Sequence, residues 1–214
     1  MEVFFVRHGE TDGNQVKRHQ FSHISLNEKG KKQALAVADR LKEIKPTHLY
    51  TSSFKRAEET AGFIKQATGL KVVSMPMFAE VIRPEYIRGE SHFGFKSFFY
   101  MMAWYFSLQN ETIRKGGGET YNDFIQTVDK AVDWCQKFAT DDRLVIVSHS
   151  VFINFFLMQV IYGELKWWQT PRRFFTILRL KNTAIVHLSF KSKDEYSAFG
   201  DWKFIGTDTE HIST

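Results

Sequence analysis

The apolar run at residues 3–6 is followed directly by five residues whose types could take part in binding or catalysis, Arg7-His8-Gly9-Glu10-Thr11. Arginine offers a planar cationic fork, histidine a titratable nitrogen nucleophile, and glycine a backbone that a ligand can approach closely. These groups predict a binding site for an anion, and a phosphoryl group fits them best. The alternative is an ordinary hydrogen-bonded histidine, because short motifs also arise by chance.

A second histidine, His149, follows another apolar run at residues 144–147. Both runs are short and wholly apolar, which is typical of strands buried on both faces of a parallel sheet. Ligands bind at the carboxyl ends of the strands in such sheets. If the two strands are neighbours, His8 and His149 lie close together, so that one can attack a phosphoryl group while the other binds it.

Arg56 is expected in the first turn of a helix that follows a second short strand. Backbone amides and the positive end of the helix dipole would add to its guanidinium there, and both favour an anion. The alternative for Arg56, taken alone, is an ordinary surface residue.

The elements that must position these residues alternate between strand and helix, which predicts an α/β fold. We expect a three-layer α/β/α sandwich with a mostly parallel central sheet, an antiparallel edge strand and helices on both faces. Asn27 is the expected N-cap of the first long helix, and Gly69 is expected to end the second. The predicted strands are 3–6, 47–51, 71–75, 144–147, 174–180 and 183–190, and the predicted helices are 29–44, 54–67, 119–138 and 151–162.

Residues 76–118 lose this regularity and are expected to be an aromatic-rich insertion in a single domain that spans residues 1–214. Its aromatic side chains favour core packing, with a substrate-facing wall or a partner surface as alternatives. The oligomeric state is left open. The aromatic residues are Phe95, Phe98, Phe99, Tyr100, Trp104, Tyr105 and Phe106.

Composition narrows the classes of function. The net charge is +5, but the basic residues are scattered, so the sequence predicts no nucleic-acid footprint. The single cysteine, Cys135, excludes an internal disulfide and fits a reducing compartment. No targeting segment and no membrane-spanning apolar run are recognised, so a cytoplasmic protein without a membrane partner is expected.

With these residues in place, the chain resembles the histidine phosphatase superfamily, which includes phosphoglycerate mutases and many small phosphomonoesterases. The resemblance covers nearly the whole chain in the family's order, and it is closest to the small phosphatase branch. The matching residues are Arg7 to Thr11, Asn14, Gly30 with Gln33-Ala34, Arg56 with Thr60-Ala61, Glu80, Gly117 to Glu119, Val147 to His149 and Asn182-Thr183.

The resemblance implies a role for each site residue. His8 would attack phosphorus and become a phosphohistidine, and Glu80 would act as the general acid and base. Phosphate-binding groups would surround the phosphoryl oxygens. Family members use no metal, so neither a metal nor another cofactor is expected. The phosphate-binding residues implied are Arg7, Arg56, His149 and Asn14.

Two arginines follow Glu80 closely in the sequence. Arg83 and Arg88 are candidates for substrate binding, with solvated surface residues as the alternative. For Glu80 itself, the alternative is an exposed loop carboxylate. The chain departs from the family at two positions: Ser150 stands where many members have glycine, and Phe21 replaces the glycine of a Gln-Gly pair. These two positions fall at the phosphate pocket and at its entrance.

The favoured function is a phosphoric monoester hydrolase of the histidine acid phosphatase type, acting on a small phosphorylated metabolite and releasing inorganic phosphate. The chain is compact, whereas the family's glycolytic mutases are longer, so mutase-type phosphoryl transfer is the alternative. A non-catalytic phospholigand-binding module is a further alternative, and a nucleic-acid binder is less favoured still. The sequence contains no readable code for the identity of the substrate.

Overall fold

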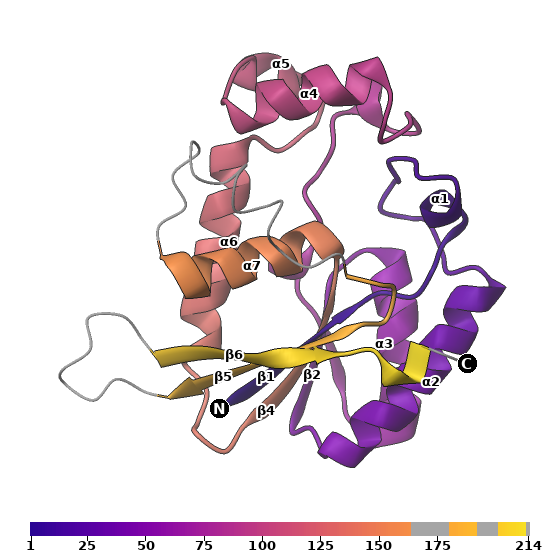
Figure 1. Cartoon of the computed structure of the whole chain (residues 1–214), viewed down its shortest axis with the longest axis vertical. Helices are drawn as coiled ribbons and strands as arrows, with labels where there is room; N and C mark the ends of the chain where they lie inside the picture. The colour runs from indigo at the N-terminus through magenta and orange to yellow at the C-terminus, as the bar shows by residue number, and fades with distance from the viewer. Residues whose placement is uncertain (164–179, 192–200, 213–214) are drawn as a thin grey trace.

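The computed structural model describes residues 1–163, 180–191 and 201–212 (Figure 1). Its centre is a six-stranded sheet in the order β3-β2-β4-β1-β5-β6. The first four strands in that order are parallel, and β5 is antiparallel to both β1 and β6. The strands are β1 (Glu2–Arg7), β2 (His48–Thr51), β3 (Val72–Ser74), β4 (Arg143–Ser148), β5 (Ile185–Lys191) and β6 (Asp201–Asp208).

Helices cover both faces of the sheet, which confirms the predicted α/β class (Figure 1). Alternate residues of β1 point to opposite faces. Val3 and Phe5 pack with α6 and α7, whereas Phe4 and Val6 pack with α2 and α3. Burial on both faces explains why the strand is apolar throughout. These helices are α2 (Glu28–Ile44), α3 (Lys55–Thr68), α6 (Tyr121–Cys135) and α7 (Ser150–Tyr162).

Local signals set the ends of the two helices on the α2 and α3 face. Asn27 caps α2 by accepting a hydrogen bond from the amide of Gly30 at 2.8 Å. Gly69 ends α3 in the left-handed conformation, with φ of 74°. The boundaries of both helices agree with the sequence prediction within one residue. By contrast, α6 is shorter than predicted at both ends. Thr120 caps its start, so the helix begins at Tyr121, and its last residue is Cys135.

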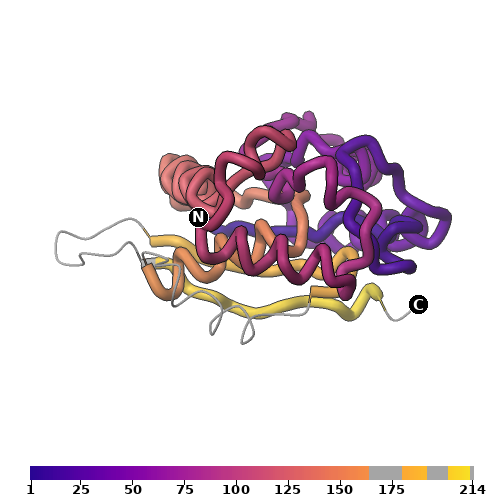
Figure 2. Tube along the Cα trace, turned by 90° about the horizontal axis from the view of Figure 1, so that it is seen from above, coloured from indigo at the N-terminus to yellow at the C-terminus, as the bar shows by residue number. Residues whose placement is uncertain are grey.

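The segment between β3 and α6 contains short elements rather than a strand. They are the 3₁₀ turns η1 (Pro76–Phe78) and η2 (Glu85–Ile87) and the helices α4 (Phe95–Tyr105) and α5 (Asn110–Lys115). Both α4 and α5 lie at the same end of the molecule as α1 (Asp12–Gln15), beyond the sheet (Figure 1). Figure 2, seen from that end, shows α4 crossing in front of the strands.

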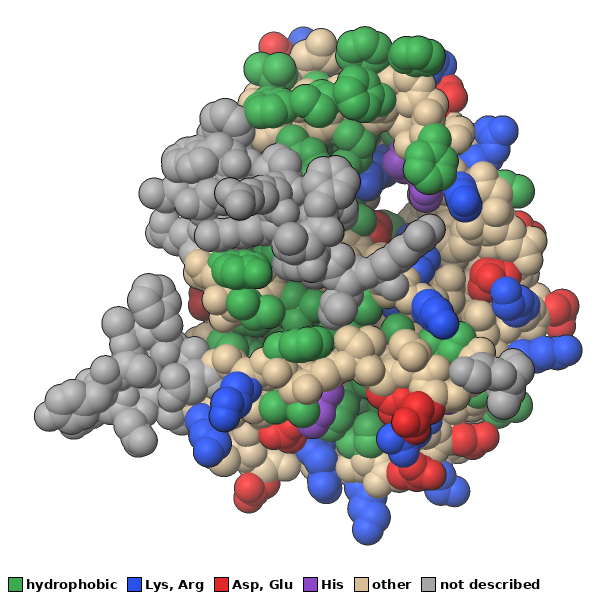
Figure 3. Space-filling view, in the orientation of Figure 1, with side chains coloured by type: hydrophobic (Ala, Val, Ile, Leu, Met, Phe, Trp, Pro, Cys, Tyr) green, Lys and Arg blue, Asp and Glu red, His purple; other side chains and the backbone are tan. Residues whose placement is uncertain are grey.

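The prediction that the aromatic residues of this segment pack in the core is correct for only part of them. Tyr100, Trp104 and Tyr105 are buried. The other four are exposed, because α4 turns one face toward the core and the opposite face outward. Figure 3 shows a green hydrophobic surface over the end of the molecule that α4 occupies. The exposed rings are those of Phe95, Phe98, Phe99 and Phe106, with 85%, 59%, 66% and 38% of their surface accessible.

The edge of the sheet differs from the prediction. Residues 174–179 of the expected strand 174–180 lie outside the described residues, and Leu180 is not in a strand. The outer neighbour of β5 is instead β6, in a polar segment to which the sequence assigned no element. In the described part of the chain, no helix is long and apolar enough to cross a membrane.

Candidate active site

The pairing of β1 with β4 brings the two sequence-predicted histidines together. The strands are parallel neighbours, with Arg7 in register with Ser148, so each histidine follows its strand at the same edge of the sheet. The ring centroids of His8 and His149 are 5.0 Å apart. Both side chains are buried, with 4% and 0% of their surface accessible.

The hydrogen bonds of His8 define which ring nitrogen can act as a nucleophile. Nδ1 lies 2.7 Å from the carbonyl oxygen of Gly9, and a carbonyl only accepts, so Nδ1 carries the proton. Nε2 accepts a hydrogen bond from Arg56 Nε at 3.2 Å and is therefore unprotonated. Burial, and then the positive charges of Arg56 and Arg7, lower the pKa of His8 well below its ordinary value. The imidazole is thus neutral at neutral pH, with the lone pair of Nε2 toward Arg56.

Arg56 occupies the first turn of α3, as the sequence predicted, but it is buried there rather than exposed. Its Nη1 donates to the carbonyl oxygen of Phe21 at 3.0 Å, and its guanidinium lies 5.0 Å from the ring centroid of Phe54. Burial lowers the pKa of Arg56 to about 10, which still leaves it charged at neutral pH. A fixed cation therefore lies beside the reactive nitrogen of His8.

Two buried nitrogen atoms of the site have no hydrogen-bond partner within the described chain. They are Arg7 Nε and His149 Nδ1. The remaining polar atoms that hold these side chains are paired: Arg7 Nη1 donates to the carbonyl oxygen of Leu180 at 2.6 Å, and His149 Nε2 lies 2.7 Å from Ser52 Oγ. An unpaired buried polar atom costs about 1–3 kcal/mol. Arg7 Nε is a donor, and His149 Nδ1 is a donor in the tautomer in which Ser52 Oγ donates to Nε2, so in that tautomer both nitrogens suit a ligand with acceptor oxygens.

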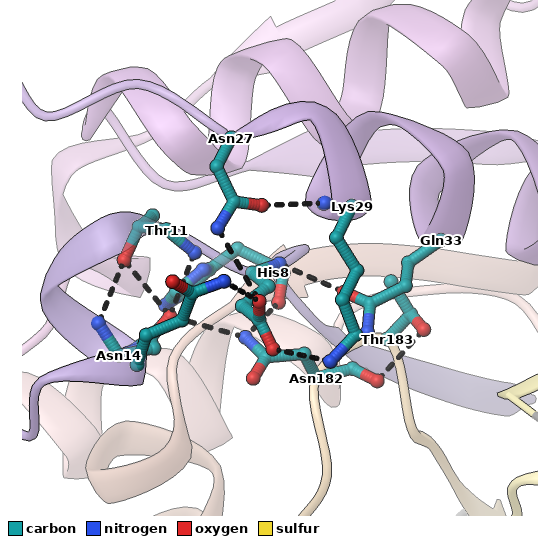
Figure 4. A network of polar contacts seen from close by, with 11 residues as sticks. His8, Thr11, Asn14, Asn27, Lys29, Gln33, Asn182 and Thr183 are labelled. Atoms are coloured by element: carbon teal, nitrogen blue, oxygen red, sulfur yellow. Dashed lines mark hydrogen bonds and ion pairs between the residues drawn. The ribbon is translucent and has the colours of Figure 1, made fainter.

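A polar network behind His8 fixes the backbone of its loop (Figure 4). Asn182 Nδ2 donates to the carbonyl oxygen of His8 at 3.0 Å and lies 3.2 Å from Asn14 Oδ1. Asn14 Oδ1 also accepts from the amide of Thr11 at 3.2 Å. Because its oxygen is engaged in this way, Asn14 keeps its amide nitrogen as a donor, and its side chain lines the pocket.

Glu80 joins the site from the segment after η1. Its two carboxylate oxygens accept hydrogen bonds from the backbone amides of Val81, at 3.1 Å, and Val151, at 3.2 Å. Val151 lies in the first turn of α7, so Glu80 is held at the start of the helix that follows His149. This anchoring places the carboxylate on the same pocket as His8.

The pocket has a volume of about 280 Å³ and is lined by Arg7, His8, Asn14, Arg56 and Glu80, among others. Of the two predicted substrate-binding arginines, the structure brings only Arg83 to this pocket. Arg88 lines an adjoining cavity of about 120 Å³, which also contacts Arg83. Its Nε donates to the carbonyl oxygen of Arg83 at 2.9 Å, so Arg88 supports the backbone next to the pocket.

Several residues at the site were not among the sequence-predicted functional residues. Ser52 contacts His149, Asn182 contacts His8, and His19 and His92 line the pocket. The position of Ser52 directly after β2 was a usable signal, since the strand ends at the same edge of the sheet. Nothing in the local sequence marks His19 or His92, because loops far apart in the chain bring them together.

The comparisons with known proteins agree with this geometry. The sequence profile of the histidine phosphatase superfamily (branch 1) matches residues 3–198, so the chain belongs to this superfamily of enzymes. Among curated proteins, the chain is 30% identical over 198 residues to a protein named probable phosphoglycerate mutase GpmB from Escherichia coli. That alignment covers 89% of this chain and 86% of the relative.

Solved structures of similar fold include phosphatases. A mycobacterial glucosyl-3-phosphoglycerate phosphatase superposes with a TM-score of 0.75 at 22% identity, covering 95% of this chain and 96% of that one. A phosphoserine phosphatase from Entamoeba histolytica, in complex with 3-phosphoglyceric acid, gives 0.74 at 20% identity, with 99% and 98% covered. At these identities the likeness shows a shared fold.

Proposed function

We propose that this protein is a metal-independent phosphomonoesterase that acts on a small phosphorylated metabolite through a phosphohistidine on His8. The observation that carries the proposal is the neutral imidazole of His8, whose unprotonated Nε2 lies 3.2 Å from the buried cation of Arg56. A nucleophile needs an unprotonated nitrogen, and the phosphoryl group it attacks needs positive charge around its oxygens. His8 Nε2 is unprotonated, and its lone pair becomes available for attack when Arg56 Nε donates to a phosphoryl oxygen instead.

The first step forms a nitrogen–phosphorus bond and breaks the phosphorus–oxygen bond of the ester. The lone pair of His8 Nε2 attacks phosphorus, while Glu80 in its protonated form gives a proton to the leaving oxygen. Donors from Arg7, Arg56, His149 and Asn14 stabilise the charge on the phosphoryl oxygens. The products of this step are the free alcohol and the phosphohistidine.

The second step returns the enzyme to its starting state. Glu80, now a carboxylate, accepts a proton from water, and the water oxygen attacks the phosphorus atom. The nitrogen–phosphorus bond breaks, and its electron pair returns to His8 Nε2. Inorganic phosphate leaves, and Glu80 holds the proton for the next cycle.

The charges that a metal ion would otherwise supply come from side chains in this scheme. We expect a panel of small phosphomonoesters, assayed with and without a chelator, to release inorganic phosphate at the same rate in both conditions. A loss of most activity on chelation, restored by adding a divalent cation, would contradict the metal-independent mechanism.

Mutase-type transfer is the second candidate, because the curated relative at 30% identity is named as a probable phosphoglycerate mutase. The two reactions share the phosphohistidine and differ in whether water or a second substrate hydroxyl accepts the phosphoryl group. With 3-phosphoglycerate as substrate, we expect free phosphate to form faster than 2-phosphoglycerate. Faster isomer formation would establish the mutase instead.

A further inference from the structure

The pocket that holds His8 is also lined by basic side chains that the proposed chemistry does not use. Arg83, Arg18, His19 and His92 belong to this second group. They lie on the α4 side of the pocket, since Arg83 contacts Met101 of α4 and His19 contacts Ser97 of α4. Figure 3 shows side chains in blue and purple around an opening between the α4 end of the molecule and the body below it.

Arg83 carries a charge that its surroundings do not neutralise. Its guanidinium interacts with two uncharged residues of α4: Nη1 lies 3.3 Å from Met101 Sδ, and the guanidinium lies 5.4 Å from the ring centroid of Tyr100. No carboxylate of the described residues pairs with it. These contacts hold the side chain in place, yet they leave a partly buried cation in need of an anion.

The two histidines shape this part of the pocket without adding charge. Their rings are 4.4 Å apart, and His19 is buried, with 9% of its surface accessible. Ser97 Oγ donates its hydrogen to the carbonyl oxygen of Ser91 at 2.6 Å, so His19 Nε2, at 3.1 Å, must donate to Ser97. Burial, with the charge of Arg83 second, lowers the pKa of His19 to about 3. The fixed charge on this side therefore comes from the arginines.

The balance of charge in the pocket exceeds what one phosphoryl group requires. Four arginines line the pocket, and Glu80 is the one carboxylate among its lining residues. A phosphomonoester brings about two negative charges at neutral pH, which match Arg7 and Arg56 beside His8. Arg83 and the more exposed Arg18 are left for a second anionic group.

We propose that Arg83 binds a second anionic group of the substrate, so that the preferred substrates are small phosphomonoesters that also carry a carboxylate or a second phosphate. The size of the pocket supports this class of compound. Its volume of about 280 Å³ corresponds to roughly nine water molecules. A compact metabolite, with its two anionic groups a few bonds apart, can be accommodated in this volume. The inference rests on the proposed phosphomonoesterase function.

The test compares two substrates that differ in one group. 3-Phosphoglycerate carries a carboxylate where glycerol 3-phosphate carries a neutral hydroxymethyl group. We expect wild-type kcat/KM, measured as total turnover, to be about tenfold higher for 3-phosphoglycerate, the size of one well-formed charged hydrogen bond. Arg83→Met should abolish this preference, by lowering kcat/KM for 3-phosphoglycerate about tenfold more than kcat/KM for glycerol 3-phosphate.

Arg114→Met is the matched control, because it removes the same charge from an exposed residue of α5 that pairs with Asp123 outside the pocket. It should keep the wild-type preference. A second pair of substrates, propane-1,3-diol bisphosphate and propane-1,3-diol monophosphate, shows whether phosphate replaces carboxylate as the second anion. The subsite proposal is overturned if wild type shows no preference within either pair of substrates. It is also overturned if the wild-type preference persists in Arg83→Met.

Failure of the subsite and failure of the proposed function give different results. If wild type turns over none of these compounds, the phosphomonoesterase proposal fails, and calorimetric binding of the same pairs to wild type and Arg83→Met then tests the subsite directly. Tighter binding of the doubly anionic compound, lost in Arg83→Met, would support the subsite. Equal or absent binding would overturn it.

Discussion

At the scale of single residues, the chemistry of the site depends on charge states that residue types do not reveal. The sequence predicted Arg7, His8, Arg56 and His149 as a group, and the structure places all four around the strand ends. The sequence could not predict that both histidines are neutral. Burial, and then the charge of Arg56, lower the pKa of His8 and of His149 well below the ordinary value. Arg56 lies far from either histidine in the sequence, so its effect depends on the fold.

Replacing Arg56 tests whether its charge acts on the transition state. Arg56→Met keeps an unbranched apolar stem and removes both the hydrogen bond to His8 Nε2 and the positive charge. We expect kcat/KM for phosphomonoesters to fall about 10²- to 10³-fold, as for other fixed donors to a developing oxyanion. Steady-state kinetics beside Arg114→Met, the exposed control, measures this. A fall below about tenfold would contradict the role given to Arg56.

At the scale of elements, two glycines allow the loop after β1 to touch the first turn of α2. A Cβ added to Gly30 would collide with the carbonyl oxygen of Glu10 and lie 2.7 Å from its backbone nitrogen. On the other side of the contact, a Cβ on Gly9 would lie 2.5 Å from the carbonyl oxygen of Gly30. The backbone that carries His8 is therefore positioned by direct contact with α2.

Replacing a helical glycine by alanine should have opposite effects on stability at Gly62 and at Gly30, because only Gly30 makes this contact. Gly62 lies inside α3 with no atom near its added Cβ, so Gly62→Ala should stabilise the fold by about 0.5–1 kcal/mol through helix propensity. Gly30→Ala gains the same propensity but forces the loop away, so a net loss of about 1–3 kcal/mol and reduced activity are expected. Denaturant unfolding of both variants measures the signs. Stabilisation by Gly30→Ala would refute the close contact.

The elements that the sequence predicted well are those set by local signals. Asn27 and Gly69 mark the ends of helices through their own backbone and side-chain chemistry, so they can be identified without knowledge of the fold. The pairing of β6 with β5 is not local, and the mixed polar sequence of β6 shows no strand pattern. The outward rings of α4, such as Phe95, were equally hard to predict. The type of an aromatic residue alone favours burial, and only the packing of its helix shows that the side chain is exposed.

At the scale of the whole molecule, folding buries neutral histidines at the end of the sheet capped by α4. His8, His149 and His19 all have pKa values below the ordinary value, chiefly because burial penalises their charged form. Below about pH 6.5 the unfolded chain binds protons that the folded chain does not. This contribution to stability is therefore complete above the unfolded pKa and is lost as the pH falls.

The size of this pH dependence of the free energy of unfolding can be derived for His19. Its pKa of about 3 in the folded state implies a loss of about 2 kcal/mol in the free energy of unfolding between pH 7 and pH 5. We expect His19→Gln, which can still donate to Ser97, to show a pH dependence shallower than wild type by that amount. His23→Gln, at an exposed histidine, should follow the wild-type profile. Urea unfolding at both pH values measures this, and parallel profiles for wild type and His19→Gln would contradict it.

If His8 carries the phosphoryl group during turnover, the covalent intermediate can be trapped on its side chain. Glu80→Gln, which slows attack by water, is mixed with radiolabelled p-nitrophenyl phosphate, whose leaving group departs without a proton from Glu80. The mixture is quenched in alkali to preserve phosphohistidine and digested for mass spectrometry. We predict label on the peptide that contains His8, and none in the double variant with His8→Ala, whose circular dichroism should match that of wild type. Label on another residue, or full turnover by the single variant His8→Ala, would contradict the account.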